Sequence, residues 1–237
     1  MSVLYDFIAN KRVVIVGPSP CLQGSGDGKI IDSFDVVCRP NHFWTNDELK
    51  NDYGSRTDIL FHNFGTDWIP GLKDNIENHK EDFNALKMLV CPLIYGTRIK
   101  EDNYMSWPED HIGDVVHNAK SINTNGIPFQ WIGVKKYQRI YHIIGCQPYT
   151  GTLSVLMLLE CPVKDLYVTG FDFYQTDKAY ADGLHNPLDG PPSQIGGPHG
   201  DMASNKQIFA FKNLLKIHKT LKYDEQLNKI ISNSYFL

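Results

Sequence analysis

The short run Arg12-Val13-Val14-Ile15-Val16-Gly17 constrains the fold of this chain more than any other feature. The four residues between Arg12 and Gly17 are all apolar and β-branched, with no alternation of polar and apolar positions. A strand has this composition when helices cover both faces of its sheet, because neither row of side chains then meets water. The run therefore predicts an interior strand of a parallel sheet.

Further apolar runs of the same kind follow along the chain, and each predicts another strand. They span residues 35–39, 58–62, 88–91, 140–144 and 165–170, and residues 229–231 are a further candidate. Apolar residues at helical spacing lie between them, most clearly at 150–161 and 201–221. This alternation predicts a single-domain, Rossmann-like α/β/α sandwich with a mostly parallel sheet. A chain of 237 residues buries about 70% of its surface, so residues 1–237 are expected to form one domain without disulfide or metal support.

Charge and cysteine content argue against several classes of protein. The net charge of −4 disfavours a general nucleic-acid-binding protein, because phosphate neutralisation needs a basic face. The five cysteines form no CxxC pair, which disfavours a zinc site and a secreted disulfide framework. The sequence has no signal peptide and no run of 18 apolar residues, so no membrane-spanning segment is expected. These features together predict a cytoplasmic protein.

Two long segments have no regular pattern. Residues 96–130 are polar, and residues 182–200 are dominated by glycine and proline. Loops of this length in a compact domain are usually functional or disordered. We therefore expect both segments to be functional loops.

Polar residues follow the first three predicted strands at their carboxyl ends, where parallel α/β sheets bind ligands. Gly17 and Ser19 follow the first strand, Asn41 the second and Asn63 the third. Glycine permits close approach of a phosphate or sugar, and asparagine both donates and accepts hydrogen bonds. The alternative is that these residues only form turns and caps.

Later in the chain, polar groups occur at a predicted helix start and after a predicted strand. Thr150 and Gly151 open a helix whose free N–H groups suit an anion, unless Thr150 is only an N-cap. Tyr174 and Tyr180 follow the strand that begins near Asp165, and their hydroxyls could stabilise developing negative charge. The alternative for both tyrosines is packing in the core.

Two histidines, His185 and His199, lie in the Gly/Pro-rich segment before the last long helix. Histidine is the commonest general base near neutral pH, although a single histidine is often structural. No Asp-x-Asp pair, HExxH or Walker A loop is present, so no metal and no cofactor is expected.

These residues together resemble the sialyltransferases of glycosyltransferase family 29, and in places those of family 42. Residues 11–43 are similar to the large sialyl motif of family 29, ending in an Ile-Asp-x-x-Asp-x-Val-x-Arg-x-Asn pattern that Ile31, Arg39 and Asn41 help to form. Residues 54–57 match the Gly-x-Arg-Thr that follows, and residues 150–174 resemble the small sialyl motif. The order of the matches agrees with the families over much of the chain.

The resemblance implies a variant of the GT-A fold and an inverting, metal-independent transfer of sialic acid from CMP-sialic acid to a glycan or glycolipid hydroxyl. His199, in the Gly/Pro-rich segment 182–200, is then the general base, so this segment is expected to be a catalytic loop. The polar segment 96–130 matches no motif, and its length leads us to interpret it as a lid on the acceptor side. Tyr174, Tyr180 and His185 stabilise the leaving phosphate. The CMP site would be lined by Gly17, Ser19, Asn41, Asn63, Thr150 and Gly151.

Four positions depart from the family pattern and keep alternatives open. Pro18 replaces an asparagine, Ser204 replaces an acidic residue, and Gln147 replaces a donor-binding arginine. The resemblance also implies a disulfide between the two sialyl motifs. Cys161 lies near the second position of that disulfide, but Val13 stands at the first, so the disulfide cannot form. The donor could therefore be CMP-Kdo or another CMP-activated acid, or the chain could be a binding module for CMP or glycan without activity. The oligomeric state is not predicted.

Overall fold

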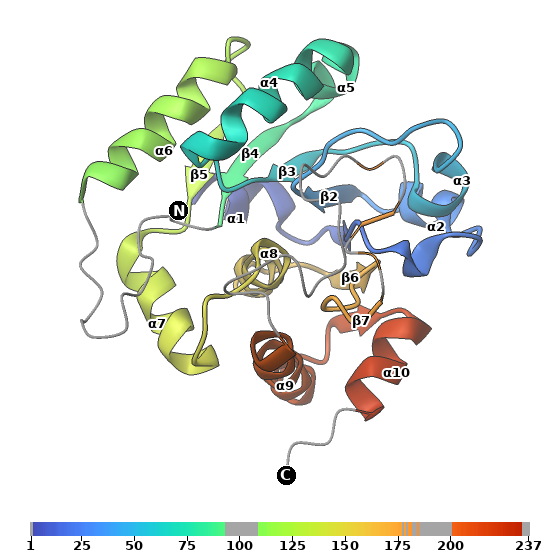
Figure 1. Cartoon of the computed structure of the whole chain (residues 1–237). Coiled ribbons are helices and arrows are strands. Elements are labelled where there is room, and N and C mark those ends of the chain that lie inside the picture. The colour runs from blue at the N-terminus through green and yellow to red at the C-terminus, as the bar shows by residue number, and fades with distance from the viewer. Residues whose placement is uncertain are drawn as a thin grey trace.

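The structure, a computed structural model, describes residues 2–92, 109–176, 178, 180, 181, 184 and 201–233. Within these residues seven strands form one sheet in the order β5-β4-β3-β2-β1-β6-β7, and every neighbouring pair is parallel. Helices cover both faces of this sheet, as Figure 1 shows. The predicted α/β/α sandwich is confirmed.

The strands are short, and most follow the apolar runs of the sequence. Their bounds are β1 Arg12–Val16, β2 Val36–Pro40, β3 Ile59–Phe61, β4 Met88–Cys91, β5 Phe129–Trp131, β6 Asp165–Thr169 and β7 Leu221–Tyr223. The helices are α1 Val3–Ile8, α2 Gly28–Asp32, α3 Lys50–Tyr53, α4 Ile69–Asn78, α5 Lys80–Ala85, α6 Glu109–Ile122, α7 Val134–Ile144, α8 Thr150–Leu159, α9 Asp201–Ile217 and α10 Glu225–Asn233. Two short 3₁₀ turns, η1 Pro20–Leu22 and η2 Thr66–Trp68, complete the elements.

Alternate side chains of β1 enter two different cores. Val13 and Ile15 pack in the core that α1, α7, α8, α9 and α10 share. Val14 and Val16 pack on the other face, in the core of α2 and α3, while α4, α5 and α6 cover the sheet farther along. All four side chains are fully buried, which explains why the run is apolar without alternation.

Helix α8 lies directly on the sheet and is buried on nearly all sides. Its apolar residues Leu153, Val155 and Leu158 are fully inaccessible to solvent. Figure 1 shows α7 and α9 on the side of α8 that faces away from the sheet. These two helices therefore form an outer layer over α8.

Two predicted strands are wrong, because both segments form amphipathic helices. Residues 140–144 belong to α7, where Tyr137, Ile140 and Ile144 share a buried face at helical spacing. Residues 229–231 belong to α10, which buries Leu227 and Ile231. In each case the buried stripe of a helix was interpreted as a continuous apolar strand.

Two further boundaries are corrected. The predicted helix 201–221 ends at Ile217, and Leu221 begins the edge strand β7. The supposedly irregular segment 96–130 contains α6 and the first residues of the other edge strand, β5. The lid function of 96–130 stays a prediction. The Gly/Pro-rich segment 182–200 lies outside the described residues, except for Leu184.

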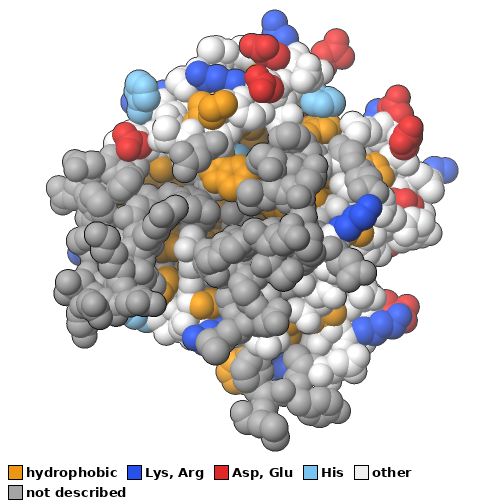
Figure 2. Space-filling view, in the orientation of Figure 1, with side chains coloured by type: hydrophobic (Ala, Val, Ile, Leu, Met, Phe, Trp, Pro, Cys, Tyr) orange, Lys and Arg blue, Asp and Glu red, His pale blue; other side chains and the backbone are white. Residues whose placement is uncertain are grey.

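None of the helices among the described residues is both long enough and apolar enough to cross a bilayer. Figure 2 shows acidic and basic side chains next to one another over α4 and α5. These two helices carry charges of both signs, with Lys73 and Lys80 among four acidic residues.

Candidate functional site

The carboxyl ends of β1 and β6 meet where the strand order reverses. Gly17 N–H donates to Thr169 O at 2.8 Å, and Ser19 N–H donates to Gly170 O at 3.1 Å. A Cβ on Gly17 would lie 2.2 Å from Gly170 O, and one on Gly170 would lie 2.5 Å from Gly17 O. Both positions therefore require glycine. Parallel α/β sheets bind ligands outside this reversal point, so the candidate site is placed here.

Two tyrosines and an asparagine from separate loops meet at this edge of the sheet. The Tyr174 hydroxyl hydrogen-bonds to Tyr180, and the Asn41 side chain bonds to Tyr180 as well. Burial raises the pKa of Tyr174 well above its ordinary value. Burial also raises the pKa of Tyr180, while the bonds from Tyr174 and Asn41 lower it. Hydrogen-bonded hydroxyls of this kind can donate to an anionic ligand.

The Tyr174 backbone is held in an unusual conformation by Asp172. Phe173 and Tyr174 have φ values of 52° and 61°, in the left-handed region that side chains other than glycine rarely adopt. The buried Asp172 carboxylate accepts from Tyr174 N–H at 3.0 Å and, through its other oxygen, from the Thr176 hydroxyl. Strained backbone of this kind clusters at functional sites. The sequence analysis missed Asp172, although an aspartate that begins a turn is a recognisable signal.

A second tyrosine contact links the start of α9 to the same site. The Tyr149 ring meets the Tyr174 ring edge-on, with centroids 5.0 Å apart. The Tyr149 hydroxyl shares a 2.7 Å hydrogen bond with Ser204, and Gln207 Oε1 accepts from Tyr149 N–H at 2.9 Å. Ser204 stands where the family has an acidic residue, and here it is buried and fixes Tyr149 instead. Tyr149 and Gln207 were also missed from sequence.

The turn after β3 uses its polar side chains to hold its own backbone. Asn63 Oδ1 accepts from Gly65 N–H at 2.9 Å, and His62 Nδ1 accepts from Phe64 N–H at 2.9 Å. Phe64 has a φ of 51° and is fully buried. Asn63 can still offer a ligand its amide N–H groups and the second lone pair of Oδ1. Burial lowers the pKa of His62 to about 4, so this histidine is neutral.

Three predicted CMP-binding residues have structural roles of their own. Ser19 Oγ accepts from Cys21 N–H at 3.2 Å and caps η1, which leaves its hydroxyl proton and one lone pair for a ligand. Thr150 is the first residue of α8 and not its N-cap, which is Tyr149. A Cβ on Gly151 would lie 2.4 Å from the Phe171 ring, so this glycine permits α8 to pack against the loop after β6.

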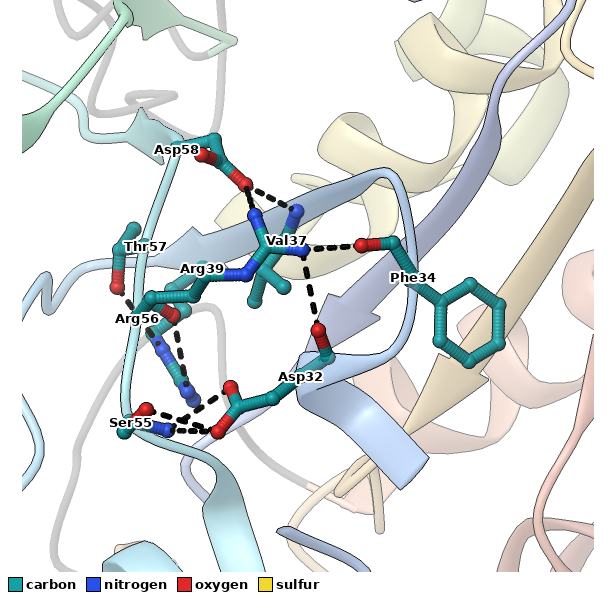
Figure 3. Close-up of polar contacts among 8 residues, drawn as sticks. All are labelled: Asp32, Phe34, Val37, Arg39, Ser55, Arg56, Thr57 and Asp58. Carbon is teal, nitrogen blue, oxygen red and sulfur yellow. Dashed lines mark hydrogen bonds and ion pairs between the residues drawn. The ribbon is translucent and has the colours of Figure 1, made fainter. Parts of the chain in front are cut away.

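Most of the motif residues that carry the family resemblance lie away from this site, in a buried polar cluster (Figure 3). Arg39 is fully buried and donates from Nε to Thr57 Oγ1 at 3.0 Å and from Nη2 to Tyr53 O at 2.6 Å. Burial lowers the pKa of Arg39 to about 10, and the charge of Asp32 opposes that shift. Asp32 also accepts from Ser55 N–H at 2.9 Å. The cluster joins α2, β2 and the loop before β3.

Arg56 completes the cluster at the other end. It bonds to the Asp58 carboxylate and to Phe34 O, while Asp58 accepts from Val37 N–H at 2.8 Å (Figure 3). Asp58 and Val37 lie near the amino ends of their strands, opposite to the candidate site. Arg56, Asp58 and Val37 therefore stabilise the fold at the end of the sheet opposite to the candidate site.

The structure thus brings Asn41, Tyr174 and Tyr180 together and places Gly17 and Ser19 beside the reversal point. His199 and His185 lie outside the described residues. All five cysteines are free thiols.

Comparison with known proteins supports the resemblance. Residues 9–91 match the sequence model of glycosyltransferase family 29 (sialyltransferase). No curated protein sequence matches the chain. The match covers the large sialyl motif and ends with β4.

Solved sialyltransferase structures share the fold. A mammalian sialyltransferase in complex with Gal-beta-1-3GalNAc-ortho-nitrophenol aligns with a TM-score of 0.51 and 19% identity, covering 93% of this chain and 71% of that one. A variant of the sialyltransferase CST-II in complex with CMP aligns with a TM-score of 0.57 and 19% identity, covering 96% of this chain and 86% of that one. At this identity the alignments show the fold. Together with the family match, they confirm the resemblance to sialyltransferases.

Proposed function

We propose, from the family match of residues 9–91 and the sialyltransferase fold, that this chain transfers sialic acid from CMP-sialic acid to a glycan hydroxyl. The transfer inverts the anomeric centre and uses neither a metal nor a cofactor. CMP leaves with one phosphate, whose charge is small enough for hydrogen bonds to compensate. The neighbours that were solved with CMP and with a galactoside support this choice of donor and acceptor class.

The meeting of Tyr174, Tyr180 and Asn41 is the observation that carries the proposal. As the bond between sugar and phosphate breaks, negative charge grows on the phosphate. A hydroxyl proton of Tyr174 or Tyr180 can be donated to that phosphate, because the two tyrosines and Asn41 form one hydrogen-bonded group. Hydrogen bonds in series polarise one another, so this group can donate more strongly than a single hydroxyl. Removing one such donor typically costs about 10²–10³ in rate.

His199 removes the proton of the acceptor hydroxyl in this proposal. The helix that begins two residues later, α9, is anchored to the site through Ser204 and Gln207, which both bond to Tyr149. Tyr149 in turn contacts Tyr174. The start of α9 is therefore held close to Tyr174, which supports the choice of the histidine that precedes this helix in the sequence. General-base help is typically worth about 10²–10⁴-fold.

The test is release of CMP from CMP-sialic acid in the presence of a galactoside acceptor. We expect Tyr180→Phe and His199→Ala each to lower kcat by at least about 100-fold, while His218→Ala, near the far end of α9, leaves it unchanged. EDTA should not change the rate. Near-normal transfer by His199→Ala would refute its role as base, and EDTA inhibition reversed by Mg²⁺ would refute metal independence.

A panel of donors separates the alternatives. CMP-sialic acid and CMP-Kdo are compared at equal concentration, with donor hydrolysis as a second readout that needs no acceptor. Faster turnover of CMP-Kdo would reassign the donor. Tight CMP binding without transfer or hydrolysis of any donor would favour a binding module. This alternative is motivated by Pro18 and Ser204, which depart from the family pattern.

A further inference from the structure

The outer helices α7 and α9 carry charge of one sign. Within their bounds lie six lysines and arginines, whereas the only acidic residue is Asp201 at the start of α9. The whole chain has a net charge of −4, so the rest of the molecule is acidic. This separation of charge is unlike α4 and α5, where both signs alternate over the surface (Figure 2).

Much of this positive charge faces away from the core. On α7 the buried side is formed by Tyr137, Ile140 and Ile144, and the exposed side carries Lys135 and Arg139. Lys136 contacts Glu160 instead and does not belong to the exposed side. The outer side of α7 thus carries two cations about one turn apart.

The outer side of α9 continues that surface. Lys206 Nζ donates to Gly145 O, at the end of α7, at 2.8 Å, which ties the two helices together. Ser204, Gln207 and Phe211 face the core, while Lys216 is exposed on the opposite side. In Figure 1, α9 lies beneath α8, and the lower end of α7 approaches α9 from the left.

Large apolar side chains are exposed among these cations. Ile143 of α7 is 75% exposed, and Phe209 and Ile217 of α9 are 49% and 72% exposed. Most exposed large hydrophobic residues are scattered singly and need no explanation. Here three of them share two adjacent helices with the basic residues, and water solvates such a surface poorly. We call Lys135, Arg139, Ile143, Phe209, Lys216 and Ile217 the α7–α9 face.

We infer that the α7–α9 face binds the surface of an anionic lipid bilayer. Lysine and arginine are attracted to anionic headgroups, while the apolar side chains between them enter the boundary between headgroups and acyl chains. A nucleic acid would satisfy the cations but would leave the apolar residues in water. The inference does not depend on the proposed catalytic function, because none of these residues contacts the candidate site.

Vesicle flotation tests the inference directly. The full chain is mixed with vesicles of phosphatidylcholine alone or with phosphatidylglycerol, at low and at high salt. We expect binding only to the anionic vesicles and weaker binding at high salt. Each cation contributes roughly fivefold to partitioning, so Lys135→Glu/Arg139→Glu/Lys216→Glu should lower it by at least about 100-fold.

Matched variants separate this binding from general electrostatics. Lys73→Glu/Lys80→Glu reverses two exposed charges on α4 and α5 and should leave binding unchanged. Ile143→Ser/Ile217→Ser should weaken binding although it changes no charge. Circular dichroism and thermal unfolding must show that each variant is folded. Folding is expected because all the substituted side chains are exposed.

Three results would overturn the inference. The first is no binding of the wild type to anionic vesicles at low salt. The second is a loss of vesicle binding in the Lys73→Glu/Lys80→Glu control as large as in the α7–α9 charge variant. Unchanged vesicle binding by Ile143→Ser/Ile217→Ser, with wild-type binding to heparin as strong as to the vesicles, would count in the same way. The third is a dimer that Ile143→Ser/Ile217→Ser converts to a monomer while vesicle binding is unaffected, which would assign the face to a second copy of the chain.

Discussion

Two buried histidines should make the folded protein sensitive to mild acid. His62 Nδ1 accepts a hydrogen bond from Phe64 N–H, so its proton is on Nε2. His42 Nδ1 lies 3.0 Å from Pro40 O, and because a carbonyl only accepts, this nitrogen carries the proton. Burial lowers the pKa of His62 to about 4. Burial, with the nearby charge of Arg39, lowers the pKa of His42 to about 3.

The sign and size of the effect follow from proton linkage. In the unfolded chain both histidines take up protons near pH 6.5, whereas in the folded chain they do so only near pH 4 and pH 3. Their contribution to stability is therefore complete above pH 6.5 and is lost as the pH falls below it. Each histidine lowers the free energy of unfolding by about 1.4 kcal/mol per pH unit in this window. The two together remove roughly 4 kcal/mol between pH 6 and pH 4.5, a large part of the stability of a typical domain.

The assay is urea unfolding at a series of pH values from 7.5 to 4.5. His42→Asn and His62→Asn replace the hydrogen-bonding ring nitrogen by an amide of similar reach, and each should reduce the slope of stability against pH by about one proton. His117→Asn, on the exposed side of α6, is the control and should leave the slope unchanged. If both buried-site variants keep the wild-type slope between pH 6 and pH 4.5, the histidines are not held neutral and the reasoning fails.

Three further predictions concern the core and the candidate site. Arg39→Met should lower the free energy of unfolding by about 3–5 kcal/mol, because its buried acceptors lose their donor; a loss below about 1 kcal/mol in urea unfolding would contradict this. Gly17→Ala should destabilise the fold by several kcal/mol through its clash with the loop after β6, whereas Gly113→Ala, with open space around it in α6, should stabilise it by about 0.5–1 kcal/mol. Asp172→Asn should lower kcat only through Tyr174, so adding it to Tyr174→Phe should cause no further loss; additive losses in this double-mutant cycle would show that Asp172 acts elsewhere.

The interior strands could be predicted from sequence, and the edge strands could not. β1, β2, β3, β4 and β6 are continuous apolar runs because both of their faces are covered. β5 and β7 have three residues each and are only partly buried, so no periodicity marks them. Their pairing with β4 and β6 depends on contacts between distant segments.

The residues of the candidate site could be predicted from sequence better than the hydrogen bonds that join them. Strand ends pointed to Asn41 and Tyr174, and the family resemblance added Tyr180. The bonds that join them, and the turn that Asp172 holds, form between segments that are far apart or that need left-handed backbone. Arg39 was recognised as a motif residue, but only its burial shows that it supports the fold.

The sequence by itself determined that this chain forms a parallel α/β sheet, because short-range patterns report whether one or two faces of a strand are buried. It also determined that the polar loops would gather at one edge, since parallel strands all end on the same side. Only the tertiary structure decided that β6 lies against β1, which brings the loop of Tyr174 beside that of Gly17. That choice rests on the packing of α8 between the sheet and the layer of α7 and α9, and packing between distant segments leaves no local periodicity in a sequence.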